Sequence, residues 1–312
     1  MATVVALLMS LIALAGCSRP AGHAKGGRLY FCDDLRIHSV LPDGGDPWEL
    51  AGKPSSCPIA AGAGEIFCAS YRGPYYLVDP LRPGIFSLNP REHRRRRLTD
   101  WPVLPVLCGF AAEGRLAFFQ AAGPAEFDLL DTRTAEVRRV RLPGPPAAAA
   151  VSPTGDRAAV ALAARLRTVV LGNQAWFTEG SDVTLVPLGG GDILALEYPL
   201  LPGTPPMSPS LDHYAGGGLS ALAWRDAHAL AVSSSPGIWI LDPDHPSSSS
   251  VVRLRSPGQP LADGLAFSSD GNRLAITAGG RLIVREIATG AERDVTPPGL
   301  VGGAHHPCWS GD

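Results

Sequence analysis

Short segments in which apolar and polar residues alternate, separated by turn-forming pairs, recur along most of the chain. The clearest unit runs from Gly264 to Val295. In it an apolar segment ends in Ser-x-Asp-Gly, a second begins Arg-Leu-Ala, and a third ends in Ala-Thr-Gly before a short polar segment. Asp-Gly accepts the positive φ of a tight hairpin, and the flanking alternation buries a sheet face. The pattern predicts four short antiparallel strands.

The same sequence repeat recurs, with variations, along the chain. Its other copies cover residues 59–70 with 84–98, 109–119 with 127–142, 147–162, and 219–246. The copies start near residues 57, 106, 147, 219 and 262, and the longest interval contains an insertion. Repeats of about this length, with one four-stranded unit each, are typical of β-propellers.

The two ends of the chain complement each other. Trp309–Asp312 reads as the first half of the hairpin phrase, and Gly27–Phe31 reads as its second half. An open first or last blade would leave unpaired strand edges. We therefore expect Trp309 to meet Leu29 in one composite blade. The predicted fold is all-β: a propeller of six four-stranded blades over residues 28–312, closed by its terminal strands. The alternatives are a truncated chain or a missing seventh blade.

This phrase resembles the propeller repeat of TolB-like proteins, bacterial relatives of the WD-repeat whose typical form is W-S-P-D-G-x-R-I-A-F. The resemblance is best at Ala266–Thr277, Val151–Val160 and Trp309–Asp312, and it departs at Gly62 and Ala112, where the turn lacks Ser-Pro-Asp. It implies the propeller fold. The α/β domain that precedes the propeller of TolB has no counterpart in residues 28–312, so the Pal-binding role is not carried over.

The N-terminal segment reads as an export signal. Val4–Ala15 is apolar apart from Ser10, which is too short for a comfortable membrane span. The following Leu-Ala-Gly-Cys17 resembles a bacterial lipobox, although Met1–Ala6 contains no Lys or Arg. We expect residues 1–16 to be a lipoprotein signal peptide, Cys17 to carry a lipid, and 17–27 to be a flexible tether. A plain cleaved signal or a buried N-terminal strand is the alternative.

Composition narrows the class of protein. The 312 residues are 45% hydrophobic and 18% charged, with 36 Gly and 30 Pro. Frequent turn formers without long amphipathic runs favour an all-β chain. The net charge of −2 gives no global basic field, so we expect no nucleic-acid partner.

The cysteines agree weakly with an oxidising compartment. Beyond Cys17, the sequence leaves two disulfides open: one between Cys57 and Cys68, which flank a predicted hairpin, and one between Cys32 and Cys308, which meet if the ring closes. Cys108 is then left over. Buried free thiols are the alternative, and no spacing suggests a zinc or thioredoxin site.

No catalytic constellation stands out, and we expect neither a metal nor a cofactor. No G-x-S-x-G is present. Adjacent strand residues point to opposite faces, which makes His305 and His306 a poor ligand pair. His213, His228 and His245 are scattered over predicted turns. Convergence near the rim of the funnel, as in propellers that bind calcium there, is the alternative for Asp33, Asp34, Asp226 and Asp263, although no loop is dense in oxygen ligands. Asp residues at such positions usually cap turns.

Two further segments are chemically distinct. Arg94–Arg97 is the densest charge run, which we expect to be solvated; contact with anionic headgroups is the alternative. An insertion at 165–181 and 200–218 carries a candidate partner-contact loop with Trp176, Phe177, His213 and Tyr214. A disordered loop is the alternative reading of this insertion.

These features lead to a functional hypothesis. We expect a non-enzymatic, lipid-anchored propeller outside the cytoplasm, in the periplasm or on the outer face of the cell membrane. It would bind a protein or envelope partner through its loop face and central funnel. The alternatives are a lactonase-like or lyase-like enzyme with an active site in the funnel, and a sensor or stalk domain with a flat apolar patch.

Overall fold

The computed structural model describes the chain from residue 27 to residue 310. The segments outside this description are 34–35, 51–55, 71–83, 93, 101–104, 112–113, 121–123, 163–164, 172–173, 181–182, 197–220, 235–236, 245–251 and 254–261. Only the backbone is described at 56–58, 70, 105, 165–171, 174–180, 194–196, 234 and 252–253. The expected signal peptide, Cys17 and most of the tether lie outside the described residues. Within the described part, no helix has the length and apolar character needed to cross a membrane.

The strands form six four-stranded antiparallel sheets, each of them one blade. The first blade contains β4 (Ser56–Gly62), β5 (Glu65–Ser70), β6 (Gly84–Asn89) and β7 (Arg94–Asp100). The second contains β8 (Pro105–Ala111), β9 (Arg115–Gln120), β10 (Glu126–Asp131) and β11 (Val137–Arg141). The third contains β12 (Pro146–Val151), β13 (Arg157–Leu162), β16 (Val183–Pro187) and β17 (Leu194–Leu196). The fourth blade contains β18 (Ala221–Asp226), β19 (Ala229–Ser234), β20 (Gly237–Leu241) and β21 (Val252–Arg253). The fifth contains β22 (Ala262–Phe267), β23 (Arg273–Ala278), β24 (Arg281–Glu286) and β25 (Glu292–Asp294).

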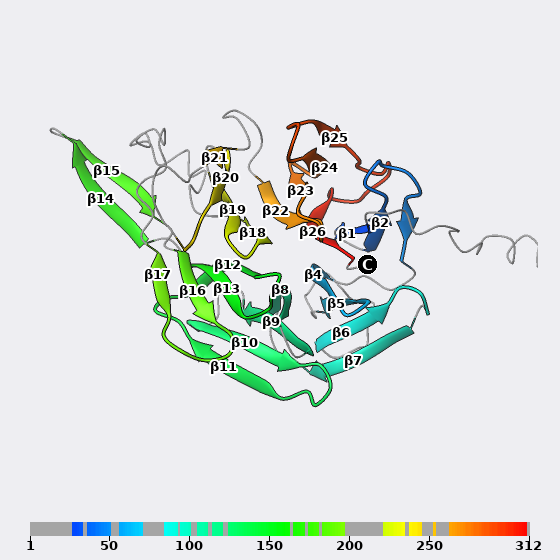
Figure 1. Cartoon of the computed structure of the whole chain (residues 1–312), viewed down its shortest axis with the longest axis horizontal. Helices are drawn as coiled ribbons and strands as arrows, with labels where there is room; N and C mark the ends of the chain where they lie inside the picture. The colour runs from blue at the N-terminus through cyan, green and yellow to red at the C-terminus, as the bar shows by residue number, and fades with distance from the viewer. Residues whose placement is uncertain are drawn as a thin grey trace, which may run out of the picture.

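The sixth blade is composite and closes the ring. It contains β26 (His305–Trp309), β1 (Leu29–Cys32), β2 (Ile37–Val40) and β3 (Trp48–Glu49), in that order. The innermost strands contact one another in ring order, β4–β8–β12–β18–β22–β26 and back to β4, and Figure 1 shows the blades arranged around this centre. The six-bladed propeller closed by its terminal strands, predicted from the sequence, is confirmed.

The seam, where β1 pairs with β26, is hydrogen-bonded in the same way as the inner strands of an ordinary blade. Leu29 pairs with Trp309 in the β1–β26 ladder. The Ser310 amide donates to the Arg28 carbonyl at 2.9 Å, and the Arg28 amide donates to Ser310 Oγ at 2.8 Å. The fifth blade contains the same pair of bonds between Ser268 and Arg273, at 2.9 and 3.0 Å, with no chain break. The two chain ends therefore rebuild one continuous copy of the repeat.

The Ser-x-Asp-Gly turn explains the sharp boundary between the first two strands of a blade. Ser268 Oγ donates to Asp270 Oδ1 at 2.5 Å, and the Asn272 amide donates to the same oxygen at 3.0 Å. Gly271 has φ +67°, a left-handed backbone conformation that residues other than glycine rarely adopt. The carboxylate thus satisfies the turn's donors while glycine supplies its geometry.

Adjacent blades are joined by a recurring tryptophan. Trp224 Nε1 donates to the carbonyl of Ala150 at 3.0 Å, and Trp309 Nε1 donates to the carbonyl of Ala266 at 2.9 Å. Each of these tryptophans is buried at the end of an innermost strand and reaches the preceding blade. Burying the indole and satisfying its N–H is a stabilising combination. The core therefore consists of a series of apolar layers between blades, and one of them packs Trp309 against Leu29 and Phe31.

Innermost strands approach so closely that side chains must be small. A Cβ at Gly264 would lie 2.5 Å from Pro307 Cδ and 2.6 Å from Thr277 Oγ1. Glycine at this position lets β22 lie against β26 next to the seam.

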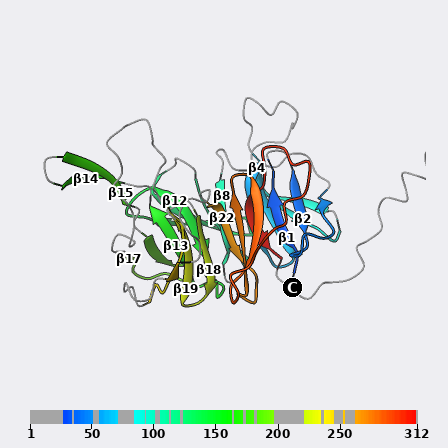
Figure 2. The same cartoon turned by 90° about the horizontal axis from the view of Figure 1, so that it is seen from above.

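The insertion in the third blade is an extra hairpin. β14 (Arg165–Leu171) pairs with β15 (Gln174–Gly180) as a separate two-stranded sheet between β13 and β16. Figures 1 and 2 both show this hairpin extending away from the ring. The sequence predicted an insertion here and left its structure open between a contact loop and disorder.

Replacement of Trp309 by alanine tests the closure. We expect Trp309→Ala to lower the free energy of unfolding by about 3–5 kcal/mol, because a large buried ring is lost at the seam. Trp309→Phe should cost less, since most of the apolar packing remains and mainly the Nε1 hydrogen bond is lost. Urea denaturation followed by tryptophan fluorescence and circular dichroism measures both. An unchanged midpoint for Trp309→Ala would contradict the seam.

Candidate functional site

The innermost strands surround the centre of the ring with small and apolar residues. Their sequences are rich in Ala, Gly, Pro and Cys, as in Pro-Ala-Ala-Ala-Ala-Val of β12 and Ser-Cys-Pro-Ile-Ala-Ala-Gly of β4. Neighbouring innermost strands run in the same direction, since Gly264 lies against His306 and Pro307, and Ala266 lies against Trp309. All of them therefore start at one end of the ring, the entry face, and finish at the other, the turn face.

Polar side chains form a cluster on the entry face, where β22 contacts β26. Asp263 Oδ1 accepts a hydrogen bond from Thr277 Oγ1 at 2.5 Å, and Asp263 Oδ2 lies 3.3 Å from His305 Nδ1. His305 Nε2 lies 3.2 Å from the Gly302 carbonyl oxygen. The His305 ring is thus held between a carboxylate and a backbone carbonyl.

His306 joins this cluster because β26 is bulged. Tyr30 pairs with Cys308 and Cys32 with His305, so His306 and Pro307 together stand opposite Phe31. His306 has φ +48°, which breaks the alternation of side chains. The centroids of the His305 and His306 rings are 6.5 Å apart. The strict alternation assumed for these two residues therefore does not apply at this bulge.

The environment of His306 favours the neutral ring. Burial lowers the pKa of His306 below its ordinary value; neighbouring Asp263 raises it and His305 lowers it further. Non-glycine residues with positive φ concentrate at functional sites, where the surrounding packing holds the strain. We define the entry-face cluster as His305, His306, Asp263 and Thr277.

Among the described residues, the other candidates from the sequence have contacts of their own, away from this cluster. Asp33 is on the entry face but serves a turn: its carboxylate accepts from the Arg36 amide at 2.6 Å and lies 3.0 Å from His38 Nε2. Asp226 ends β18 on the turn face, where it accepts from the His228 amide at 2.8 Å. His213, His245, Asp34 and Tyr214 lie outside the described residues.

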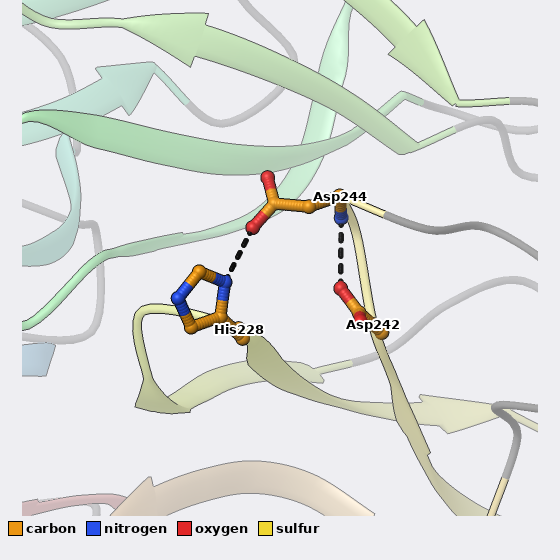
Figure 3. Close-up of side chains that lie close together, drawn as sticks. All are labelled: His228, Asp242 and Asp244. Carbon is orange, nitrogen blue, oxygen red and sulfur yellow. Dashed lines mark hydrogen bonds and ion pairs between the residues drawn. The ribbon is translucent and has the colours of Figure 1, made fainter.

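A second polar cluster, on the turn face, joins two blades. Asp244 Oδ2 lies 2.7 Å from His228 Nδ1, and the Asp244 amide donates to Asp242 Oδ1 at 3.0 Å (Figure 3). Ligand atoms of these three residues lie within 4.8 Å of one another, close enough for a shared cation.

The contacts of Asp244 argue for a structural role. Arg157, from the third blade, forms two hydrogen bonds with Asp244, at 2.6 and 3.1 Å, and its guanidinium lies 4.9 Å from the centre of the Trp224 ring. An incoming cation would have to displace this guanidinium. The hydrogen bond from Arg157, with the one from His228, lowers the pKa of Asp244 to about 2. The cluster is best understood as an ionic clasp between the third and fourth blades.

One perturbed carboxylate lies away from both faces. Burial raises the pKa of Asp128, in the third strand of its blade, to about 6, while Arg139 at 3.4 Å opposes this shift. A shifted pKa marks a functional candidate only when the group opens to a cleft. Asp128 is 1% exposed within a sheet, so its shift reflects packing.

The cysteines differ from the pairing that the sequence suggested. Cys68, Cys108 and Cys308 are free thiols, so the two suggested disulfides, Cys57–Cys68 and Cys32–Cys308, are wrong. Cys32 is disulfide-bonded, and its partner is none of these three. Proximity in the repeat was a poor guide because Cys68 points into the apolar layer beside Phe86 and Ile66.

The predicted contact loop is only partly within the described structure. Trp176 pairs with Val169 and Phe177 with Thr168 in the β14–β15 ladder, which places both on the projecting hairpin. The sequence singled out these aromatic residues, and it named His305, His306 and Asp263 as separate candidates. It did not bring the three together, because a bulge at His306 has no signature in the repeat.

Comparisons with known proteins establish the fold. TolB from Acinetobacter baumannii has a similar solved structure, with a TM-score of 0.63 and 17% identity, over 91% of this chain and 66% of that one. The tricorn protease is similar at a TM-score of 0.53 and 9% identity, over 86% of this chain and 33% of that one. No protein-family model and no curated protein matches the sequence. The protein thus has a TolB-like propeller fold, and it spans less than two thirds of either neighbour.

Removal of the Asp244 charge tests the clasp. We expect Asp244→Asn to lower the free energy of unfolding at pH 7 by about 1–2 kcal/mol, since a partly exposed ion pair is screened by solvent. The folded-state pKa of Asp244 lies below its ordinary value of 3.8, so its contribution is present above pH 4 and is lost toward pH 2. The difference between mutant and wild type should disappear over that interval. Glu136→Gln, at an exposed turn, is the matched control.

Thiol reactivity tests the cysteine assignment. Burial raises the pKa of Cys68 to about 11 and raises those of Cys108 and Cys308 as well. Because the thiolate is the nucleophile, iodoacetamide at pH 8 should label these three about 100-fold more slowly in the native than in the unfolded protein. Peptide mass mapping should find Cys32 labelled only after reduction and unfolding. Rapid native labelling of the three would refute the assignment.

Proposed function

We propose that this protein is a non-enzymatic propeller, located outside the cytoplasm and tethered by a lipid on Cys17, that binds a protein or envelope partner. The single observation that carries the proposal is the projecting hairpin β14–β15 on a closed ring. A closed ring of packed blades is rigid, and recognition elements displayed on a rigid scaffold lose little freedom on binding.

The centre of the ring supports binding over catalysis. Innermost strand β12, with the sequence Pro-Ala-Ala-Ala-Ala-Val, offers shape and backbone groups without reactive side chains, and the acid–base groups of β22 and β26 lie on the entry face. A partner segment entering the ring would meet the entry-face cluster at its rim and apolar surface further in. Val301, which is 50% exposed on the entry face beside Asp33, adds an apolar contact point there.

Two observations support the location. The Leu-Ala-Gly-Cys17 sequence follows an apolar segment of signal length. Cys32 is disulfide-bonded, and disulfides persist chiefly in oxidising compartments outside the cytoplasm.

The entry-face cluster supports a second candidate, a propeller enzyme of the lactonase-like or lyase-like kind. Two histidines and a hydrogen-bonded carboxylate on the entry face, where β22 meets β26, are suitable acid–base groups. We rank it lower because both nitrogens of His305 already face protein oxygens, and His306 is largely buried. A general base needs a ring nitrogen within reach of its substrate.

Affinity purification from detergent-solubilised membranes tests the leading proposal. The full chain should retain a specific partner, and the purified pair should bind saturably in calorimetry. Trp176→Ala with Phe177→Ala should weaken binding at least about tenfold, because aromatic anchors dominate interface energies. Thr289→Ala, on the exposed turn before β25, should leave the affinity unchanged.

The anchor is tested separately. Cys17→Ala should abolish incorporation of labelled palmitate and release the protein from the membrane fraction, while partner affinity stays the same. A purified pair whose affinity ignores the hairpin variant would refute the contact surface. Equal palmitate labelling of both forms would refute the anchor.

A further inference from the structure

Arginine is concentrated on the outermost strands of two blades. β7 and β11 together contain seven arginines and one carboxylate, Asp100. We refer to these seven as the arginine rim: Arg94, Arg95, Arg96, Arg97, Arg138, Arg139 and Arg141.

The other four outermost strands carry no such charge. β3, β17, β21 and β25 together hold two arginines against three carboxylates. The net charge of the whole chain is −2, so the positive charge is a local feature of one part of the perimeter.

Tertiary structure places the two basic strands on one side of the ring. Their blades are neighbours, since β4 and β5 contact β8. Each of the two strands is the last of its sheet, with one edge unpaired. Figure 1 shows β7 and β11 along the same outer edge, while hairpin β14–β15 extends in another direction. Separated by some 40 positions in sequence, the strands form one basic edge.

The guanidinium groups are accessible to a ligand. The side chains of Arg94, Arg96 and Arg139 are 70%, 48% and 57% exposed. Their solvent-accessible carboxylate neighbours Glu92, Glu65 and Glu126 lie at 3.8–3.9 Å, and exposed pairs of this kind contribute little. Arg139 also lies 3.4 Å from the buried Asp128, yet its own side chain remains largely exposed.

Two more groups complete the accessible set. Arg138 and Arg141 are exposed, and within the described side chains neither has an ion-pair partner. Arg95 stacks on the Phe86 ring at 3.9 Å, which fixes the middle of the rim to the blade.

The arrangement favours a phosphate-bearing surface over other anions. Arginine binds phosphate oxygens through paired N–H donors. Neither strand contains an aromatic residue, so the rim lacks the stacking platform that single-stranded nucleic acids use. Charged side chains protect sheet edges from aggregation, but the other four outermost strands carry no comparable run of arginines.

We infer that the arginine rim binds the headgroup phosphates of an anionic lipid bilayer. Such binding orients the propeller edge-on to the membrane. Both faces of the ring, with the entry-face cluster on one and the clasp on the other, then remain open to a partner. The inference goes beyond the proposed function and holds with or without a lipid on Cys17.

Vesicle cosedimentation tests this inference with the full chain. Vesicles of phosphatidylglycerol and phosphatidylcholine in equal parts are compared with pure phosphatidylcholine, at 0.1 and 0.5 M salt. The apolar N-terminal segment contributes to both kinds of vesicle, so the difference between them isolates charge. We expect at least about tenfold stronger binding to the anionic vesicles at low salt, reduced at high salt by screening.

A charge-matched pair of variants localises the effect. Arg94→Gln, Arg96→Gln, Arg138→Gln and Arg141→Gln together should abolish the preference for anionic vesicles. Arg36→Gln, Arg225→Gln, Arg281→Gln and Arg293→Gln remove the same charge elsewhere and should retain it. Melting temperatures and size-exclusion profiles of both variants check that the fold and the oligomeric state of the wild type persist.

Three results would overturn the inference. The wild type could show no preference between vesicles, or the two variants could lose it equally. Heparin or inorganic phosphate could bind the rim while vesicles do not, which would assign it to a soluble anion. None of these outcomes depends on the partner measured through hairpin β14–β15, so the proposed function stands or falls separately.

Discussion

Pairing of the two chain ends in one sheet is the constraint on which this structure depends. Without β26 the composite blade would start at β1 with an exposed ladder of unpaired N–H and C=O groups, and without β1 the last strand would have no partner in its own sheet. Leu29 and Trp309 are in register, and the Ser310–Arg28 bonds repeat those of an uninterrupted turn. The ring is thereby held as one cooperative unit, although the residues that close it are almost the full chain length apart.

The seam also concentrates the irregular backbone. The bulge at His306 and Pro307, the positive φ of His306 and the close approach at Gly264 all lie where β26 meets its neighbours. Strain of this kind persists because ladder bonds and the buried Trp309 fix the strand on both sides. The same bulge brings His306 to His305 and Asp263. The entry-face cluster is therefore a product of closure.

Two kinds of contact connect the blades, and they contribute differently to the free energy of unfolding. A buried indole with a satisfied N–H, as at Trp224 and Trp309, removes a large apolar area from water. The Arg157–Asp244 clasp is partly exposed and screened. The apolar layers between blades consequently contribute most of the stability of the ring. The charged clasp aligns the third blade with the fourth at the turn face. Charges elsewhere on the perimeter are then free to serve recognition, as we propose for the arginine rim.

The all-β class, the repeat, the six blades and the closing pair Leu29–Trp309 could be predicted from the amino-acid sequence, because the Ser-x-Asp-Gly turn and strand alternation act over a few neighbouring residues. The sequence also located an insertion, although not its hairpin. Three-dimensional packing was needed to show which cysteines remain free, that a bulge brings His306 into the surroundings of Asp263, and that β7 and β11 lie along one edge. Those features depend on register, on a bulge and on how blades stack, and such contacts join residues that no local pattern connects.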